Sequence, residues 1–123
     1  MNYAQAAERL KQSAKLGWKP GLESVARLCA RLGDPQDALP TVHIAGTNGK
    51  GSVCAMIASS LRAAGYQTGL YTSPYLADYR DSFDIGGEKI TREEFADVMA
   101  AVYAQADAMA AEGLYPTEFE ILT

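Results

Sequence analysis

The stretch that decides the fold of this 123-residue chain is Thr41-Val42-His43-Ile44-Ala45-Gly46-Thr47-Asn48-Gly49-Lys50-Gly51-Ser52. Four of its first five residues are β-branched or apolar, the exception being His43, and this predicts a short buried strand. Three glycines fall within residues 46–51, and a helical pattern follows over residues 50–64, with one apolar face made by Val53, Met56, Ile57, Leu61 and Ala64. A strand, a glycine-rich turn and a helix in this order are typical of the first half of a βαβ unit.

Residues 67–72 are predicted to form the second strand of that unit, after Gly65 ends the helix. Strands joined by a crossover helix are parallel, and the crossover is right-handed. The expected fold class is therefore α/β, with a parallel sheet flanked by helices.

Working outward, helices are predicted over residues 3–15, capped by Asn2, and over residues 22–32. On the other side, residues 83–90 alternate around Gly86-Gly87, which predicts a hairpin. Capping boxes open further helices at Thr91 and at Thr117. The expected organisation is a helical pair with its linker (1–40), the βαβ unit (41–72), a loop and hairpin (73–90), and a helix followed by the start of another (91–123).

The last capping box stands close to the final residue, and two parallel strands are too few for a stable open sheet. These features predict that the chain is the N-terminal piece of a longer protein, with the C-terminal part of that protein as its missing partner. An uncovered sheet edge would also favour self-association of the piece.

Composition excludes several classes of function. The chain has 11 basic and 15 acidic residues, a net charge of −4, and no basic block, which disfavours nucleic-acid binding. It has no apolar run long enough to span a membrane, and no signal peptide is visible. Cys29 and Cys54 are distant in sequence, so we interpret them as free buried thiols in a reducing compartment, the cytoplasm, rather than as a disulfide or metal pair.

The segment from Gly46 to Ser52 carries the strongest chemical signal. Glycines allow backbone N–H groups to approach phosphate oxygens, and a helix N-terminus adds its unpaired donors and positive dipole end. Lys50 can neutralise phosphate charge, and a nearby hydroxyl can reach Mg²⁺. The common eight-residue pattern is not met, since Ile44 replaces its first glycine and Gly51 follows Lys50. The alternative is a plain glycine-rich turn with an exposed lysine.

The run His43-Ile44-Ala45-Gly46-Thr47-Asn48-Gly49-Lys50-Gly51-Ser52 resembles the nucleotide loop of folylpolyglutamate synthase and of bifunctional dihydrofolate synthase/folylpolyglutamate synthase, in the Mur-ligase superfamily. Three more segments resemble the family in order and spacing: residues 19–23, residues 71–76 and residues 117–120. The resemblance implies a P-loop ATPase domain of the Mur-ligase type and a function in folate biosynthesis and one-carbon metabolism.

The resemblance also implies a set of roles. ATP phosphates would be held by Gly46, Thr47, Asn48, Gly49, Lys50, Gly51 and Ser52, with Lys50 acting in catalysis. Mg²⁺ would be bound by the hydroxyls of Ser73 and Ser52. The pteroate or folate pocket would be bordered by Trp18, Lys19, Pro20, Gly21, Phe119 and Glu120. ATP would activate the carboxylate of dihydropteroate or folate as an acyl phosphate, and the amine of L-glutamate would attack it.

The chain departs from the family pattern at three places: Tyr75 in place of His, Asp81-Ser82 in place of Glu-Arg, and Gly86 in place of Asn. The lost Arg removes a bidentate anion contact. Further metal ligands and the glutamate-binding domain would lie beyond Thr123, so the chain alone is expected to lack ligase activity. The remaining alternatives are a stand-alone nucleotide-binding module and a different Mur-type amide ligase.

Two aromatic residues have structural interpretations beside the functional ones. His43 is expected to be a buried or sheet-edge residue rather than a catalytic base. Trp18 either borders the substrate pocket or packs the first two helices together.

Overall fold

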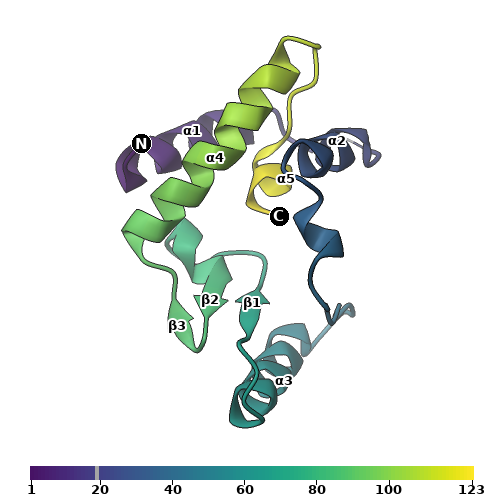
Figure 1. The fold of residues 1–123 in the computed structure, drawn as a ribbon, viewed down its shortest axis with the longest axis vertical. Coiled ribbons are helices and arrows are strands. Elements are labelled where there is room, and N and C mark those ends of the chain that lie inside the picture. Colours follow the sequence, from purple (N-terminus) through teal and green to yellow (C-terminus); the bar gives the residue numbers. More distant parts are fainter. Residues whose placement is uncertain (19) are drawn as a thin grey trace. The chain divides into compact units, whose positions relative to one another are not determined.

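The computed structural model describes residues 1–18 and 20–123, and these divide into two compact units (Figure 1). The helical unit comprises residues 1–40 and 93–123, and the loop–sheet unit comprises residues 41–92.

The helical unit contains α1 (Tyr3–Ala14), α2 (Glu23–Arg31), the 3-10 turn η1 (Pro35–Asp37), nearly all of α4 (Arg92–Ala110) and α5 (Glu118–Leu122). The predicted helices are confirmed. The side chain of Asn2 accepts a hydrogen bond from the Gln5 backbone while Gln5 reciprocates, which satisfies two otherwise unpaired donors at the start of α1. Thr117 and Glu120 form the same arrangement at α5.

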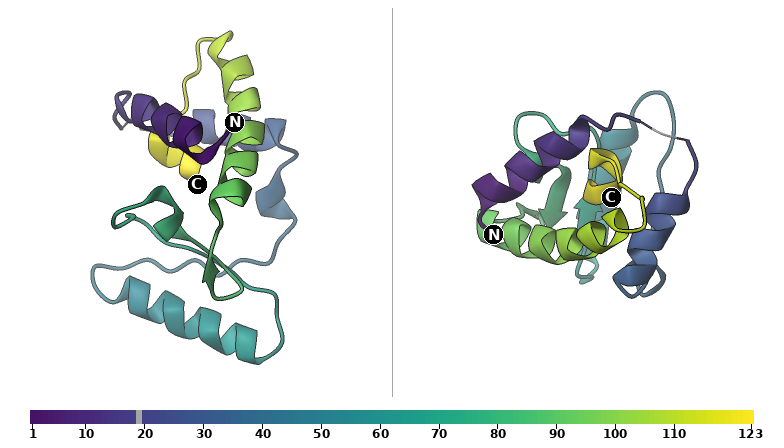
Figure 2. Two further views of the ribbon diagram at one scale, coloured as in Figure 1. Left: turned by 90° about the vertical axis from the view of Figure 1, so that its left-hand side faces the viewer. Right: turned by 90° about the horizontal axis from the view of Figure 1, so that it is seen from above.

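The core of the helical unit lies where α1 and α4 face each other. Its largest fully buried side chains are Leu10 of α1 and Phe95 and Met109 of α4. The ring of Tyr3 packs against Phe95 with centroids 5.6 Å apart. Helix α5 contacts α1 and α2, so it lies within this bundle rather than projecting from it (Figure 2).

A polar network joins α1 and α4 at the edge of this core. Arg9 donates two hydrogen bonds to the carboxylate of Asp107, at 2.6 and 3.0 Å, and its guanidinium lies 4.0 Å from the centre of the Tyr103 ring. The hydroxyls of Tyr103 and Ser13 are 3.1 Å apart. The hydrogen bonds from Arg9 lower the pKa of Asp107, partly offset by burial.

This pair predicts a pH-dependent contribution to stability. Because the folded pKa of Asp107 lies below its unfolded value, the contribution is present above that unfolded value and is lost as the pH falls through the folded pKa. Both side chains are more than one-third exposed, so a double-mutant cycle with Arg9→Met and Asp107→Asn should give about 0.2–1 kcal/mol at pH 7. Urea unfolding at pH 7 and pH 3 measures the coupling, and equal values at both pH values would contradict the assignment.

The loop–sheet unit contains α3 (Lys50–Ala63), the 3-10 turn η2 (Tyr79–Ser82) and three short strands. The strands are β1 (Gly69–Tyr71), β2 (Phe83–Ile85) and β3 (Glu88–Lys89), in the order β1-β2-β3 and antiparallel throughout. The predicted hairpin is confirmed as β2–β3. Its turn needs positive φ at Gly86 and Gly87, 65° and 93°, values that glycine adopts without steric cost.

The structure corrects the predicted parallel βαβ unit. Residues 41–45 form no strand, and β1 pairs with β2 in antiparallel register, with Leu70 opposite Asp84. A parallel strand is stable when both of its faces are covered. Here Val42 is 65% exposed and only Ile44 is partly covered, so residues 41–45 lack that cover. His43, expected to be buried or at a sheet edge, is exposed instead.

Both cysteines are free thiols, as predicted, but each is partly exposed rather than fully buried. Burial raises the pKa of the Cys29 thiol, so this thiol is less readily ionised than a fully exposed one. Among the described residues, no helix is long and apolar enough to cross a membrane.

Candidate functional site

The segment Gly46–Ser52, called the glycine loop below, leads directly into α3, and every residue in it is exposed. Gly49 is the N-cap of α3 and has φ 80° and ψ 3°, the left-handed conformation. A side chain with a Cβ adopts this conformation only with strain, which is the reason for glycine here. The turn at Gly49 therefore sets the direction in which α3 begins.

The N-terminus of α3 is open to an anion. No side chain of the described chain caps it, and its first turn has no acidic residue. The first N–H groups of a helix lack intrahelical acceptors and form the positive end of its dipole. An anion placed against the glycine loop would thus meet unsatisfied donors and no opposing charge from that turn.

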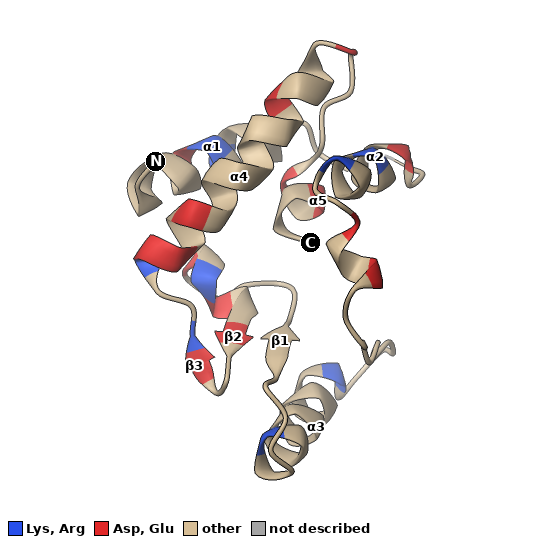
Figure 3. Cartoon of the chain, viewed as in Figure 1, with Lys and Arg blue, Asp and Glu red and all other residues tan. Residues whose placement is uncertain are grey.

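Lys50, the first residue of α3, is the cation nearest this opening in the sequence. Figure 3 shows basic residues and no acidic ones on α3. Its ammonium folds back over the glycine loop, donating to the carbonyl of Gly46 and, at 3.4 Å, to that of Thr47. Carbonyl oxygens are weaker partners for an ammonium than phosphate oxygens. A phosphate bound to the loop could accept those hydrogen bonds in their place, so the donor set fits a nucleotide phosphate.

The two candidate metal ligands are exposed hydroxyls of the loop–sheet unit. Ser52 lies in the first turn of α3, and Ser73 lies in the segment that follows β1, an element in contact with α3. Among the described residues, no group of three or more His, Cys, Asp or Glu could hold a metal ion. Mg²⁺ commonly binds through few protein oxygens together with phosphates and waters. The hydroxyls therefore fit a metal bound with a nucleotide rather than a metal bound by protein alone.

A pocket of 490 Å³ lies in the helical unit. It brings together Trp18 and Gly21 with Phe119 and Glu120, residues about 100 positions apart that the family resemblance assigned to one substrate site. Pro20 is exposed but is not part of the pocket wall, and Lys19 lies outside the described residues. The volume is within the usual range of about 300–1,000 Å³ for small-molecule sites.

The wall of this pocket is mainly apolar with two acidic groups. Trp18 is 85% exposed and Phe119 is 58% exposed, which is unusual for rings of this size. The exposure of Trp18 argues against the alternative that it packs the first two helices together. Glu118 and Glu120 add carboxylates, and one oxygen of Glu120 is engaged by the backbone N–H of Thr117.

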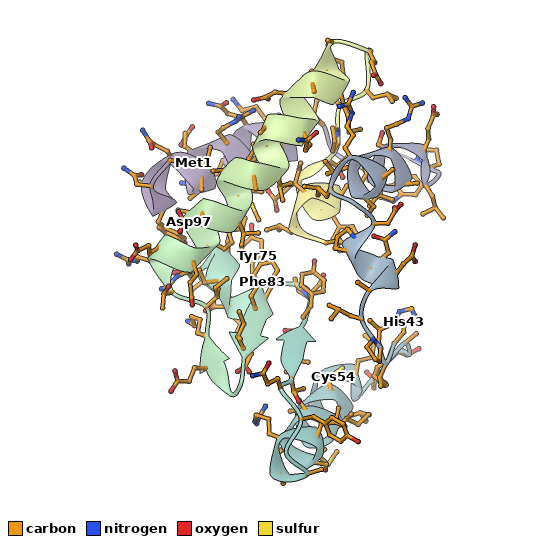
Figure 4. The ribbon with its side chains drawn as sticks, viewed as in Figure 1. Met1, His43, Cys54, Tyr75, Phe83 and Asp97 are labelled. Carbon is orange, nitrogen blue, oxygen red and sulfur yellow. The ribbon has the colours of Figure 1, made fainter. Side chains whose placement is uncertain are left out.

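Sequence reasoning missed other parts of the pocket wall, including Leu22, Val25 and Thr117. Val25 carried an available signal, since it belongs to the apolar face of α2, but such a face normally indicates core. It also missed the tilted packing of Tyr75 against Tyr79, whose ring centroids are 4.7 Å apart with an angle of 54° between the ring planes. Tyr75, labelled in Figure 4, is therefore a packing residue in this chain.

Comparison with known proteins covers nearly the whole chain. A probable bifunctional folylpolyglutamate synthase/dihydropteroate synthase of Halobacterium salinarum is 42% identical over 124 residues, which is all of this chain and 15% of that protein. The dihydrofolate synthase/folylpolyglutamate synthase of Bacillus subtilis is 39% identical over 122 residues, covering 98% of this chain and 28% of that protein. The chain is homologous to part of the folylpolyglutamate and dihydrofolate synthases.

Solved structures of these synthases are also similar to this chain. The Mycobacterium tuberculosis folylpolyglutamate synthase complexed with ADP and AMPPCP matches with a TM-score of 0.83 and 27% identity, over 98% of this chain and 28% of that one. The resemblance to synthases of the Mur-ligase fold is thereby confirmed, and these synthases are ligases. No family model matches the chain. The chain spans less than a third of the length of these relatives.

Proposed function

We propose that this chain supplies the ATP-binding loop and part of the pteroate or folate pocket of an ATP-dependent ligase that adds L-glutamate to dihydropteroate or folate. The observation that carries the proposal is the uncapped N-terminus of α3 behind the glycine loop, with the Lys50 ammonium folded over it. The M. tuberculosis structure with ADP and AMPPCP supports a nucleotide as the occupant.

The proposed reaction has two steps. A carboxylate oxygen of the pteroate or folate attacks the γ-phosphorus of ATP, the bond to the β-phosphate oxygen breaks, and ADP leaves. The amine of glutamate then attacks the acyl carbon, inorganic phosphate leaves, and the nitrogen loses a proton as the amide forms. Charge neutralisation and positioning dominate phosphoryl transfer, and the attacking nucleophiles belong to the substrates, so the reaction needs no Ser-His-Asp or Cys-His set.

The residues present have distinct tasks in this proposal. Backbone N–H groups of the glycine loop bind phosphate oxygens, and Lys50 neutralises the charge that develops on them. The hydroxyls of Ser52 and Ser73 would hold Mg²⁺, which supplies further charge neutralisation when bound. Trp18 and Phe119 offer apolar faces to a flat heteroaromatic ring, while pocket carboxylates accept its N–H donors.

Trp18 allows a direct test of the pocket, because it is the only tryptophan in the chain. Pteroate bound against it should quench its fluorescence in a saturable way, after inner-filter correction with free N-acetyltryptophanamide. Phe119→Ala should weaken the affinity by about 2- to 10-fold, the range expected for one aromatic contact.

The matched control is Leu39→Ala, an exposed apolar residue outside the pocket wall. It should leave the affinity for pteroate unchanged. Unsaturable quenching, or equal affinities in wild type and Phe119→Ala, would argue against pteroate binding in this pocket.

A further inference from the structure

The segment Ser73–Asp78, called the serine segment below, contains the proposed metal ligand Ser73 but no helix or strand. Most of its side chains are exposed, and Leu76 is 92% exposed. Tyr75, which packs against Tyr79, is its aromatic anchor, and the other side chains contribute little apolar burial. The end of the segment after Tyr75 therefore depends on polar contacts made by its backbone.

Asp81 provides such contacts at the end of the serine segment. One oxygen of its carboxylate, Oδ2, accepts hydrogen bonds from the backbone N–H groups of Ala77 and Asp78, each at 2.9 Å. The other oxygen, Oδ1, accepts a hydrogen bond from the ammonium of Lys89 on β3. A single carboxylate therefore joins the serine segment to the β2–β3 hairpin.

Two observations indicate that this carboxylate is firmly held. The Asp81 side chain is only 15% exposed, although it lies in a loop region. The hydrogen bond from Lys89, followed by those from Ala77 and Asp78, lowers the pKa of Asp81 well below its usual range. The group is thus a carboxylate, able to accept all three donors, throughout the neutral and mildly acidic range.

Neighbouring contacts hold the turn that carries Asp81. Asp78 accepts hydrogen bonds from the Arg80 backbone and guanidinium, and the same guanidinium donates to the carbonyl of Ile90 at 3.1 Å. At the start of the serine segment, Thr72 N–H donates to the carbonyl of Ser82. Both ends of the serine segment are therefore fixed to η2, and η2 is fixed to the hairpin.

We propose that Asp81 is a positioning residue, which through Lys89 and the backbone of Ala77 and Asp78 holds the serine segment in place for the Mg²⁺ of a bound nucleotide. The inference rests on the proposed nucleotide site. In this proposal Asp81 does not contact the metal. Its carboxylate and the Lys89 ammonium hold the segment in place. The family pattern has Glu-Arg at positions 81 and 82, where this chain has Asp-Ser.

Calorimetric titration of the chain with ADP, with and without Mg²⁺, tests the proposal. Asp81→Asn replaces an acceptor oxygen by an amide group, so at least one of the three donors loses its partner. We expect the affinity gained on adding Mg²⁺ to fall by about 10-fold, as is typical when a group supporting a metal ligand is lost. The affinity for ADP without Mg²⁺ should stay within about twofold of wild type, because the glycine loop makes that contact.

Two further variants separate positioning from general stability. Asp81→Glu keeps the carboxylate and should restore most of the Mg²⁺-dependent gain. Glu88→Gln, at an exposed neighbour of Lys89, makes the same change of charge and should behave as wild type. Hydrogen exchange without nucleotide should be faster at residues 77 and 78 in Asp81→Asn and unchanged in α3.

The outcomes are distinguishable. An unchanged Mg²⁺-dependent gain in Asp81→Asn, or an equal loss of affinity with and without Mg²⁺, would overturn the positioning role. A wild-type chain that binds no ADP under either condition would instead overturn the proposed function, and the inference with it.

Discussion

Lys50→Ala is expected to weaken ATP binding by about 10- to 100-fold, because a hydrogen bond to a charged group contributes about 1.5–3 kcal/mol. The hydrogen-bond acceptors of the ammonium among the described residues are the carbonyls of the exposed residues Gly46 and Thr47, so its removal leaves no buried charge unpaired. The loss should therefore appear in binding and not in folding. Calorimetric titration with ATP and Mg²⁺ measures the affinity.

The matched control for this variant is Lys11→Ala, which removes an exposed lysine from α1. It makes the same change in net charge but should leave ATP affinity within about twofold of wild type, since Lys11 is exposed and is not part of the glycine loop, and salt screens exposed charges. Circular dichroism should show equal helix content in both variants. Equal ATP affinity in Lys50→Ala and wild type would refute the role assigned to the glycine loop.

Phe95→Ala is expected to be the most destabilising single change discussed here, by about 3–5 kcal/mol. Phe95 is 1% exposed, and its ring packs against Tyr3 in the core between α1 and α4. Truncation removes buried apolar surface and leaves a cavity, and both effects add to the loss. For a domain with a total stability of about 5–15 kcal/mol, such a loss raises the unfolded fraction substantially.

Urea unfolding, followed by circular dichroism, measures this effect. Phe119→Ala is the matched control, because it removes the same ring from a site that is 58% exposed. The control should change the free energy of unfolding by less than about 1 kcal/mol, as expected for an exposed position, while still weakening pteroate binding. A similar loss of unfolding free energy in Phe95→Ala and Phe119→Ala would contradict the assignment of Phe95 to the core and of Phe119 to the pocket.

Local signals were sufficient for the helices and the hairpin. Asn2 with Gln5 and Thr117 with Glu120 are separated by three residues, so a capping box depends on almost nothing outside its own turn. Gly86-Gly87 likewise specifies a turn whose flanking residues must pair with each other. Glycine at position 49 indicated the conformation that starts α3, because few other residues adopt it without strain.

Strand pairing could not be predicted in the same way. Residues 67–72 contain the predicted strand, yet β1 pairs with the hairpin rather than with residues 41–45. Residues 41–45 and β2 both contain the β-branched or aromatic residues that suit a strand, and such a pattern does not specify the partner strand. The partner of β1 is the segment that can both hydrogen-bond to its backbone and pack against its side chains. Which segment does so depends on how the whole unit folds.

The candidate site shows the same division. Residue types and spacing alone were enough to propose the glycine loop as a phosphate site, because phosphate binding by backbone amides needs only a short turn and the first turn of a helix. Tertiary structure decided that Leu22, Val25 and Thr117 belong to the pocket wall, and that Asp81 joins Ala77, Asp78 and Lys89. These contacts form between segments that come together only when the backbone folds. A local sequence pattern cannot predict them, because their geometry exists only after the chain has packed.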